Sequence, residues 1–269
     1  MDRSAIFPDL SKPVVMGILN LTPDSFYDGG QHISDYLSRV EQMLAEGASI
    51  IDIGGASTRP GAADLSADME WDRLKGPLMK IRKKYPNTCI SIDTYHALVA
   101  RKALDAGADM INDISGGTFD PAMPAVIGKF RVPIVIMHIQ GTPGNMQQSP
   151  HYQDVVEEIY TYFLERIDIF RSSGATTLIL DPGFGFGKTV EHNFSLLNNL
   201  RRFKETGLPV LAGLSRKSMI NKVLNINPEM ALNGTTVLNT LALINGADIL
   251  RVHDVKEAME AIKLVSMLG

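Results

Sequence analysis

The sequence feature that most constrains the fold is a glycine–alanine pair that stands directly before a short apolar run at four places in the chain. A glycine suits the end of a helix because it adopts the left-handed C-cap conformation without a steric penalty. The apolar run after each pair has the length of a buried strand. The pattern therefore predicts a repeated unit of helix, cap and strand, and the four pairs begin at Gly47, Gly107, Gly174 and Gly246.

Four more apolar runs lie between these units, which raises the number of expected strands to eight. The expected strands are 14–20, 49–54, 88–93, 110–113, 133–138, 177–181, 209–215 and 248–253. Segments with apolar residues at three- and four-residue spacing separate them, as in amphipathic helices. Apolar strands that alternate with such helices indicate a parallel sheet covered on its outside. Eight units in 269 residues favour an α/β fold, a (β/α)8 TIM barrel forming a single domain over 1–269, rather than an open doubly wound sheet.

The composition is that of a soluble globular protein, with 45% hydrophobic and 21% charged residues. A net charge of −4 and the lack of a basic run argue against a nucleic-acid partner. Because neither a signal peptide nor a membrane span is recognisable, we expect a cytoplasmic protein with no membrane partner. Cys89 is the one cysteine, which excludes an internal disulfide and favours a buried, inert thiol.

The stretch DPGFGFGKT, residues 181–189, looks like a nucleotide-binding loop but has the wrong spacing. A P-loop requires a glycine five residues before the glycine of its Gly-Lys pair, and Pro182 occupies that position. In the dinucleotide-binding pattern the third glycine would coincide with Lys188. What remains is an acid, Asp181, at the end of an expected strand, followed by glycines that let the backbone turn sharply.

Polar side chains follow nearly every expected strand, and a TIM barrel places its active site at the C-terminal ends of its strands. A purely structural protein would have no reason to provide them, so the pattern predicts a functional site. In chain order the ends carry Asn20, Asp52, Asp93, Asn112-Asp113, Met137-His138-Ile139-Gln140, Asp181, Ser215-Arg216-Lys217 and Arg251-Val252-His253-Asp254.

Asp93, Asn112 and Asp181 come from three different strands and suit a ligand with several N–H donors, such as an aminopyrimidinone ring. A carboxylate accepts two parallel hydrogen bonds from such an edge, which provides both energy and orientation. The alternative is structural, with Asp181 capping a turn and Asp113 capping the following helix. We favour the ligand for Asp93 and Asp181, and the cap for Asp113.

Arg251 and His253 are two residues apart and therefore share one face of the last strand, where barrels often bind phosphate. Arg59 adds a candidate cation across the mouth. Ser218, at the start of a helix after the seventh strand, is either a helix cap or part of a site for a carboxylate or phosphate. Lys217 has no structural explanation, because a cation is disfavoured at a helix start.

Neither a zinc-binding spacing nor a nucleophile elbow is present in the sequence. A rim of acids and cations without a covalent nucleophile fits a reaction in which one substrate attacks the other, which carries its own leaving group.

Eight motifs in this order closely resemble the dihydropteroate synthase family, over about 14–265. They are ILNLTPDSFYDGG (18–30), DIGGASTRPGA (52–62), SIDT (91–94), INDI (111–114), MHIQGTPGNMQ (137–147), DPGFGFGK (181–188), LSRKSMI (214–220) and RVHDV (251–255). The chain departs from the family pattern at Tyr27, at Ala56 in place of an acid, and at Tyr95-His96.

The resemblance implies an enzyme of folate biosynthesis and a target of sulfonamides, usually a homodimer. It would be a transferase that joins 4-aminobenzoate to a dihydropterin carrying CH2-O-pyrophosphate, giving 7,8-dihydropteroate and pyrophosphate with Mg2+ as cofactor.

By motif position, the resemblance also implies the role of each site residue. Pterin-binding residues would be Asp93, Asn112, Met137, Asp181, Lys217 and Arg251. Pyrophosphate-binding residues would be Asn20, Arg251 and His253, with Mg2+ reached through Asn20. Aminobenzoate-binding residues would be Thr58, Arg59, Phe186, Lys217 and Ser218. The catalytic set would be Asn20, Asp28, Lys217, Arg251 and His253, with Asp28 and Phe26 in a first loop that closes over the site.

Two alternatives remain open. A barrel that presents methyltetrahydrofolate for methyl transfer to a corrinoid protein would share the pterin acids, but it has no need of Arg251, His253 or the STRPGA loop. An inactive pterin-binding paralogue would be expected to have lost loop residues that this chain retains.

Overall fold

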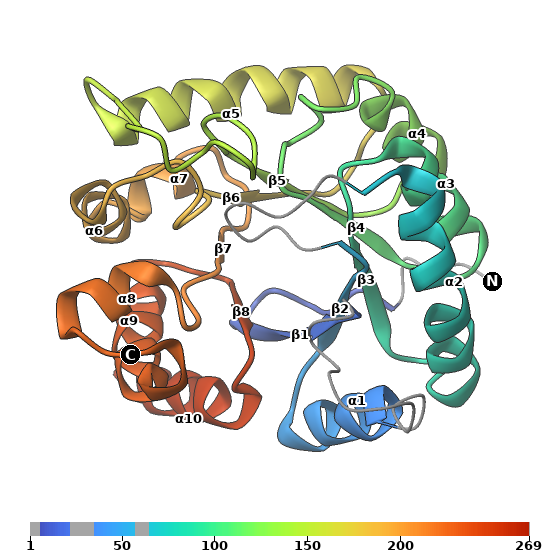
Figure 1. Cartoon of the computed structure of the whole chain (residues 1–269), viewed down its shortest axis with the longest axis horizontal. Helices are drawn as coiled ribbons and strands as arrows, with labels where there is room; N and C mark the ends of the chain where they lie inside the picture. The colour runs from blue at the N-terminus through green and yellow to red at the C-terminus, as the bar shows by residue number, and fades with distance from the viewer. Residues whose placement is uncertain (1–5, 22–34, 57–64, 269) are drawn as a thin grey trace.

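A computed structural model of the chain describes residues 6–21, 35–56 and 65–268, and its strands form the centre of the molecule with helices around them (Figure 1). The strands are β1 (Val14–Asn20), β2 (Ile50–Gly54), β3 (Cys89–Asp93), β4 (Met110–Asp113), β5 (Ile134–Met137), β6 (Leu178–Asp181), β7 (Leu211–Ala212) and β8 (Ile249–Val252). The helices are α1 (Asp35–Glu46), α2 (Ala67–Lys84), α3 (Ala97–Asp105), α4 (Met123–Phe130), α5 (Val155–Ser172), α6 (Val190–Asn198), α7 (Arg201–Lys204), α8 (Ser218–Leu224), the 3-10 helix η3 (Pro228–Met230), α9 (Leu232–Ile244) and α10 (Val255–Val265).

The eight strands form one parallel sheet in the order β6-β5-β4-β3-β2-β1-β8-β7. A single parallel bridge between Leu180 and Val210 joins its two ends, supported by the Leu180 N–H, which donates to the Pro209 carbonyl at 2.9 Å. The prediction of a TIM barrel is confirmed. All eight strands lie where they were expected, but β7 has two residues instead of seven, because the chain leaves the ladder after Ala212 and turns toward the site.

The four glycines of the repeated unit have the predicted left-handed conformation, with φ of 107°, 112°, 93° and 94°. In each unit the N–H of the following alanine donates to the carbonyl five residues earlier, as Ala48 does to Met43 at 2.9 Å. This is the hydrogen bond of a Schellman motif. All four alanines are buried, so each cap directs the chain from a surface helix into the barrel wall.

An apolar layer with one side chain from each strand fills the lower barrel: Met16, Ile50, Cys89, Met110, Val135, Ile179, Leu211 and Ile249. The segment before β1 packs beneath it through Ile6, Phe7 and Leu10. Cys89 is buried, as predicted. Because strand side chains alternate, the residue two positions later on each strand also points inward, one layer nearer the mouth. Several of these are polar: Asp52, Ser91, Asn112, Asp181 and Arg251.

Within the part of the chain that the structure describes, none of the helices combines the length and apolar character needed to cross a membrane.

Candidate active site

Arg251 is the centre of a charged network at the level where the apolar layer ends. Its Nε donates to Asp52 Oδ2 at 2.7 Å, and its Nη2 donates to Asp93 Oδ2 at 2.7 Å. Asn112 Nδ2 donates to the same Asp52 oxygen at 2.9 Å. The network joins β2, β3, β4 and β8 across the barrel, and the Asp52 side chain at its base has no exposed surface. It holds the guanidinium in place and leaves the Asn112 carbonyl oxygen turned away from Asp52.

The pKa of Asp93 is raised to about 7. Burial is the largest cause, because it penalises the carboxylate, and Arg251 opposes it by favouring the charged form. The neighbouring acids Asp52, Asp113 and Asp181 raise the pKa further. A group that titrates near neutral pH can offer a ligand either a proton or an acceptor.

Asp181 and Lys217 form the opposite wall of the mouth. Asp181 Oδ1 accepts the Gly183 N–H at 2.7 Å, and burial raises the pKa of this carboxyl against the charge of Lys217. Burial lowers the pKa of Lys217 to about 8, although Asp181 opposes the shift. A Cβ atom on Gly213 would lie 3.7 Å from Lys217 Nζ and 3.9 Å from Asp181 Oδ2. Gly213 therefore lies against both charged groups, and its lack of a side chain leaves the two unobstructed on this side.

His253 and Asn20 lie at the outer level of the mouth. His253 Nδ1 is 3.0 Å from the Ser215 hydroxyl, which also accepts the His253 N–H at 3.2 Å, so Ser215 fixes the orientation of the imidazole. A Cβ atom on Gly54 would lie 3.5 Å from Asn20 Oδ1 and 3.7 Å from Asp93 Cβ. Asn20 and Asp93 therefore both lie next to Gly54.

The glycines of DPGFGFGK turn the backbone as predicted, with φ of 72° at Gly183, 81° at Gly185 and 63° at Gly187. The turn places the Phe186 ring 4.7 Å from Lys217 Nζ, and the ammonium of Lys217 also donates to the Phe184 carbonyl. Phe186 is half-buried at the mouth. This arrangement joins the loop after β6 to the segment after β7.

Two cap interpretations are wrong. Asp113 accepts hydrogen bonds from the Ser115 and Gly117 N–H groups in the turn after β4, and helix α4 begins only at Met123. Asp113 is therefore structural, as expected, but it caps a turn. Ser218 is the first residue of α8 and makes no cap, because Lys217 occupies the N-cap position.

The remaining predicted site residues fall into two groups. Met137 is buried at the end of β5, two residues beyond the apolar layer and facing inward by the alternation of the strand. Asp28, Thr58 and Arg59, together with Phe26 and Tyr27, lie outside the residues that the structure describes.

Sequence reasoning gave no role to Asp52, Ser215 or Lys188, all of which contact site residues. Strand alternation was a usable signal for Asp52, because it lies two residues after Ile50 of the apolar layer. Ser215 had the weaker signal of a polar residue beyond a strand. The sequence carried no signal for a role of Lys188, because its contacts arise where one loop packs against another.

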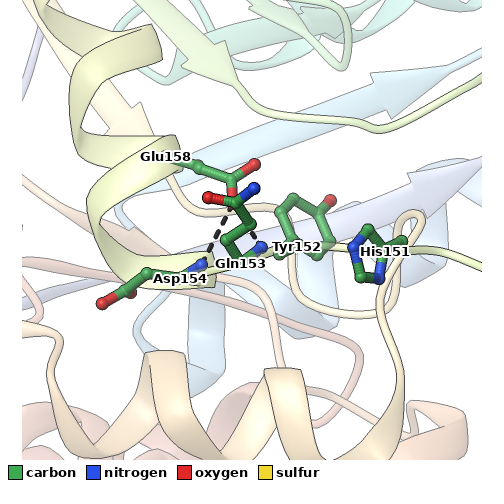
Figure 2. A pocket seen from close by; sticks show the side chains of 5 residues that line it. All are labelled: His151, Tyr152, Gln153, Asp154 and Glu158. Atoms are coloured by element: carbon green, nitrogen blue, oxygen red, sulfur yellow. Dashed lines mark hydrogen bonds between the residues drawn. The ribbon is translucent and has the colours of Figure 1, made fainter.

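A separate surface hollow of about 440 Å³ lies beside the start of α5 (Figure 2). Glu158 crosses it and accepts the N–H groups of Gln153 at 2.6 Å and Asp154 at 3.1 Å. Asp154 in turn caps α5 through the Val156 and Glu157 N–H groups. The two carboxylates here stabilise the start of a helix, and none of the predicted site residues lines the hollow.

The comparisons with known proteins agree with this geometry. The sequence profile of a family described as pterin binding enzyme matches residues 16–253. The chain is 45% identical to dihydropteroate synthase of Escherichia coli strain K12, over 96% of this chain and 92% of the relative. Yersinia pestis dihydropteroate synthase in a sulfonamide drug complex superposes with a TM-score of 0.91 at 42% identity, covering 97% of this chain and 96% of that one. The structure of Xanthomonas albilineans dihydropteroate synthase with 4-aminobenzoic acid has a TM-score of 0.90 at 39% identity, covering 96% of this chain and 94% of that one.

Identity at this level extends over nearly the whole barrel, including every strand that contributes to the charged network. The chain belongs to the dihydropteroate synthase family of pterin-binding enzymes.

Proposed function

We propose that the mouth of the barrel is where this chain carries out the family's condensation of a dihydropterin pyrophosphate with 4-aminobenzoate. The observation that carries the proposal is the convergence of Asp93, Asn112, Asp181 and Arg251 directly above a closed apolar layer. A site with an apolar floor and charged side chains above it suits a flat heterocycle with several N–H groups.

The pterin is bound by the inner wall. Asp181 uses one oxygen for the Gly183 N–H, and its other oxygen faces the space over Gly213. Asn112 presents its carbonyl oxygen, because Asp52 accepts from its amide nitrogen. Asp93 completes the acceptors, and Lys217, Arg251 and Met137 enclose the ring. Buried acceptors of this kind discriminate strongly against a ligand that lacks the matching donors.

The pyrophosphate is bound by the outer level of the mouth. Arg251 provides a fixed cation, and His253, oriented by Ser215, provides a second donor. Among the described residues no group of three His, Cys, Asp or Glu side chains is placed to hold a metal ion. Mg2+ nevertheless fits here, since it commonly takes one or two protein oxygens plus substrate phosphate oxygens. Asn20 Oδ1 would be the protein ligand, and the bound ion would neutralise charge on the departing pyrophosphate.

The arylamine reacts directly with the pterin CH2 group. Its nitrogen forms a bond to this carbon, the carbon–oxygen bond breaks with its electron pair going to pyrophosphate, and the nitrogen then loses a proton. The amine is neutral at pH 7, so no strong base is required. Phe186, Lys217 and Ser218 line the aminobenzoate subsite, and Thr58 and Arg59 are proposed to complete it. Asp28 is proposed to act in a loop that closes over the reactants.

The chain is further proposed to form a homodimer through α9, which is apolar on both faces. Leu238, Ala242 and Leu243 pack inward, whereas Val237, Leu241 and Ile244 are exposed. A helix that is apolar all round is normally buried, and a self-complementary patch generates a two-fold dimer. Further exposed apolar residues lie on the same side of the barrel, where α8, α9 and α10 gather (Figure 1): Val223, Leu224, Met230, Leu264, Met267 and Leu268.

The decisive experiment measures pyrophosphate release from 6-hydroxymethyl-7,8-dihydropterin pyrophosphate and Mg2+, with and without 4-aminobenzoate. Arylamine-dependent release with formation of dihydropteroate is expected. Asp181→Ala should abolish pterin binding, whereas Asp168→Ala, which removes an exposed carboxylate on α5, should not. Pterin binding without release in the unmodified chain would instead indicate an inactive paralogue or a methyl-transfer barrel.

A further inference from the structure

In the loop of residues 183–188, here called the glycine-phenylalanine loop, three consecutive backbone carbonyls accept hydrogen bonds from side chains. The Gly185 carbonyl accepts from Gln147 Nε2 at 2.7 Å, and the Gly187 carbonyl accepts from the Tyr152 hydroxyl at 2.9 Å. The Phe186 carbonyl between them accepts from Lys188 Nζ at 3.0 Å. Gln147 and Tyr152 both belong to the segment between β5 and α5, so one loop of the barrel fixes the backbone of the next.

Lys188 makes the most extensive of these connections. Lys188 is only 3% exposed. Its Nζ lies 3.1 Å from His138 Nδ1, 3.3 Å from the His138 carbonyl and 3.0 Å from the Phe186 carbonyl. An ammonium group has three N–H donors, and here each has one acceptor. The three bonds tie the residue after β5 to the residue that carries the aromatic ring.

The surroundings of Lys188 show that its position is built into the fold. A Cβ atom on Gly183 would lie 1.9 Å from the His138 carbonyl, so only glycine lets the loop approach β5 this closely. Burial lowers the pKa of His138 to about 2, so the imidazole is neutral, and the tautomer with its proton on Nε2 has Nδ1 free to accept from Lys188. Burial also lowers the pKa of Lys188 well below its usual value, opposed by Asp181 and assisted by Lys217. Burying an amine is costly, which argues that the three hydrogen bonds serve a purpose.

We propose that Lys188 is a positioning residue for the arylamine subsite, holding the backbone of Phe186 so that its ring stays against Lys217. The inference rests on the proposed function, because it assumes that Phe186 contacts 4-aminobenzoate. Lys188 itself does not touch the reacting atoms. Its loss should therefore change the binding of the arylamine and leave the pterin subsite intact.

The test compares Lys188→Met, which keeps the length of the side chain but removes its donors, with Lys222→Met at an exposed position on α8. Steady-state kinetics are measured for each substrate in turn, and thermal melting verifies folding. For Lys188→Met we expect the KM for 4-aminobenzoate to rise about tenfold, as the loss of roughly 1.4 kcal/mol implies. The KM for the pterin pyrophosphate should stay within about twofold, and kcat should change less than the arylamine KM. Lys222→Met should behave as the unmodified chain.

A second variant covers the case in which Lys188→Met does not fold. Tyr152→Phe removes one hydroxyl and its bond to the Gly187 carbonyl while the ring stays in place, so a smaller rise in the arylamine KM alone is expected. The inference is overturned if a folded Lys188→Met keeps its arylamine KM, if both KM values rise equally, or if Tyr152→Phe has no effect when Lys188→Met is unfolded. An unmodified chain without arylamine-dependent release overturns the proposed function as well, which separates the two failures.

Discussion

At the scale of single residues, Asp52 shows how a buried charge organises the mouth. Its Oδ2 accepts from both Arg251 and Asn112, and the side chain has no exposed surface. Burying an ion pair gains little net stability, but removing one partner leaves the other uncompensated. Asp52 therefore fixes the positions of Arg251 and Asn112, the two side chains that we propose face the pterin.

Asp52→Ala should lower the free energy of unfolding by about 3 kcal/mol, because Arg251 loses one of its two ion pairs and keeps the one with Asp93. The KM for the pterin pyrophosphate should rise together with this loss. Urea unfolding and steady-state kinetics measure the two effects. Asp52→Asn, which retains an acceptor oxygen, should cost less, and a change below about 0.5 kcal/mol in Asp52→Ala would contradict the role assigned to Asp52.

Glu70 on α2 is a second buried acid, 1% exposed, and its Oε2 accepts from the Thr94 hydroxyl at 3.1 Å. Its pKa is raised to about 8, first by burial and then by Asp93, while the Thr94 hydrogen bond and Arg73 oppose the shift. In the folded chain Glu70 is therefore protonated at neutral pH, whereas in the unfolded chain it is ionised above its ordinary pKa of 4.5. The free energy of unfolding must therefore fall as the pH rises from 4.5 to about 8, because in this range the unfolded state has lost the proton that the folded state still holds.

Glu70→Gln should remove this dependence. The free energy of unfolding of Glu70→Gln minus that of the unmodified chain should increase from pH 5.5 to pH 8, by up to about 1.4 kcal/mol per pH unit, and then level off. Other titrating groups are shared by the two proteins and cancel in the difference. Urea titrations at four pH values test it, and a difference independent of pH would show that Glu70 is ionised in the folded chain.

At the scale of elements, the Schellman caps convert a short sequence pattern into a repeated turn. The glycine takes a positive φ, the alanine N–H reaches back to the last helical turn, and the alanine side chain enters the core. The caps end α1, α3, α5 and α9, each just before a strand. The same local geometry thus starts β2, β4, β6 and β8.

Gly174→Ala tests the cost of this turn. A Cβ atom at Gly174 would meet its neighbours at 3.6 Å or more, so the strain comes from the backbone at a φ of 93° and not from a clash. We expect a loss of about 1–2 kcal/mol in the free energy of unfolding. Gly174→Asn should lose less, since asparagine tolerates the left-handed region better. Equal stabilities of the alanine variant and the unmodified chain would contradict the argument.

At the scale of the whole molecule, the lower half of the barrel interior is apolar and stabilises the fold, whereas the polar residues of the candidate site lie in the upper half. The apolar layer and the segment beneath it close the lower half, and the charged network lies directly above. Most of the exposed large apolar side chains among the described residues lie on the side of α8, α9 and α10 (Figure 1), and the others lie on α2 and α5. The proposed dimer would cover that surface without obstructing the mouth through the strand ends.

Leu241→Glu should convert the proposed homodimer into a monomer, because it places a charge in the centre of the apolar face of α9. Leu164→Glu is the matched control, since the two leucines are 42% and 43% exposed and Leu164 lies on α5. Sedimentation velocity distinguishes the species. A dimer that persists in Leu241→Glu, or dissociates equally in Leu164→Glu, would place the interface elsewhere.

The sequence by itself determined the order of the elements and the identity of most rim residues. Strand positions follow from apolar runs bounded by glycine caps, which are local properties, and β1 and β4 were predicted to the residue. The resemblance to the dihydropteroate synthase family is confirmed by relatives that match nearly the full length. Asp93, Asn112, Asp181 and Arg251 were predicted at the mouth of the barrel because a polar residue at the end of an apolar run can be recognised from the sequence alone.

Only the tertiary structure decided which of these residues contact one another. Arg251 pairs with Asp52 across 199 positions of the chain, and Lys188 reaches back 50 positions to His138. Such contacts depend on barrel closure and on how closely neighbouring loops approach, which no local pattern encodes. The helix cap expected at Asp113 and the cap that was one of two alternatives for Ser218 failed for the same reason, because the path of the chain after a strand is determined by what it packs against.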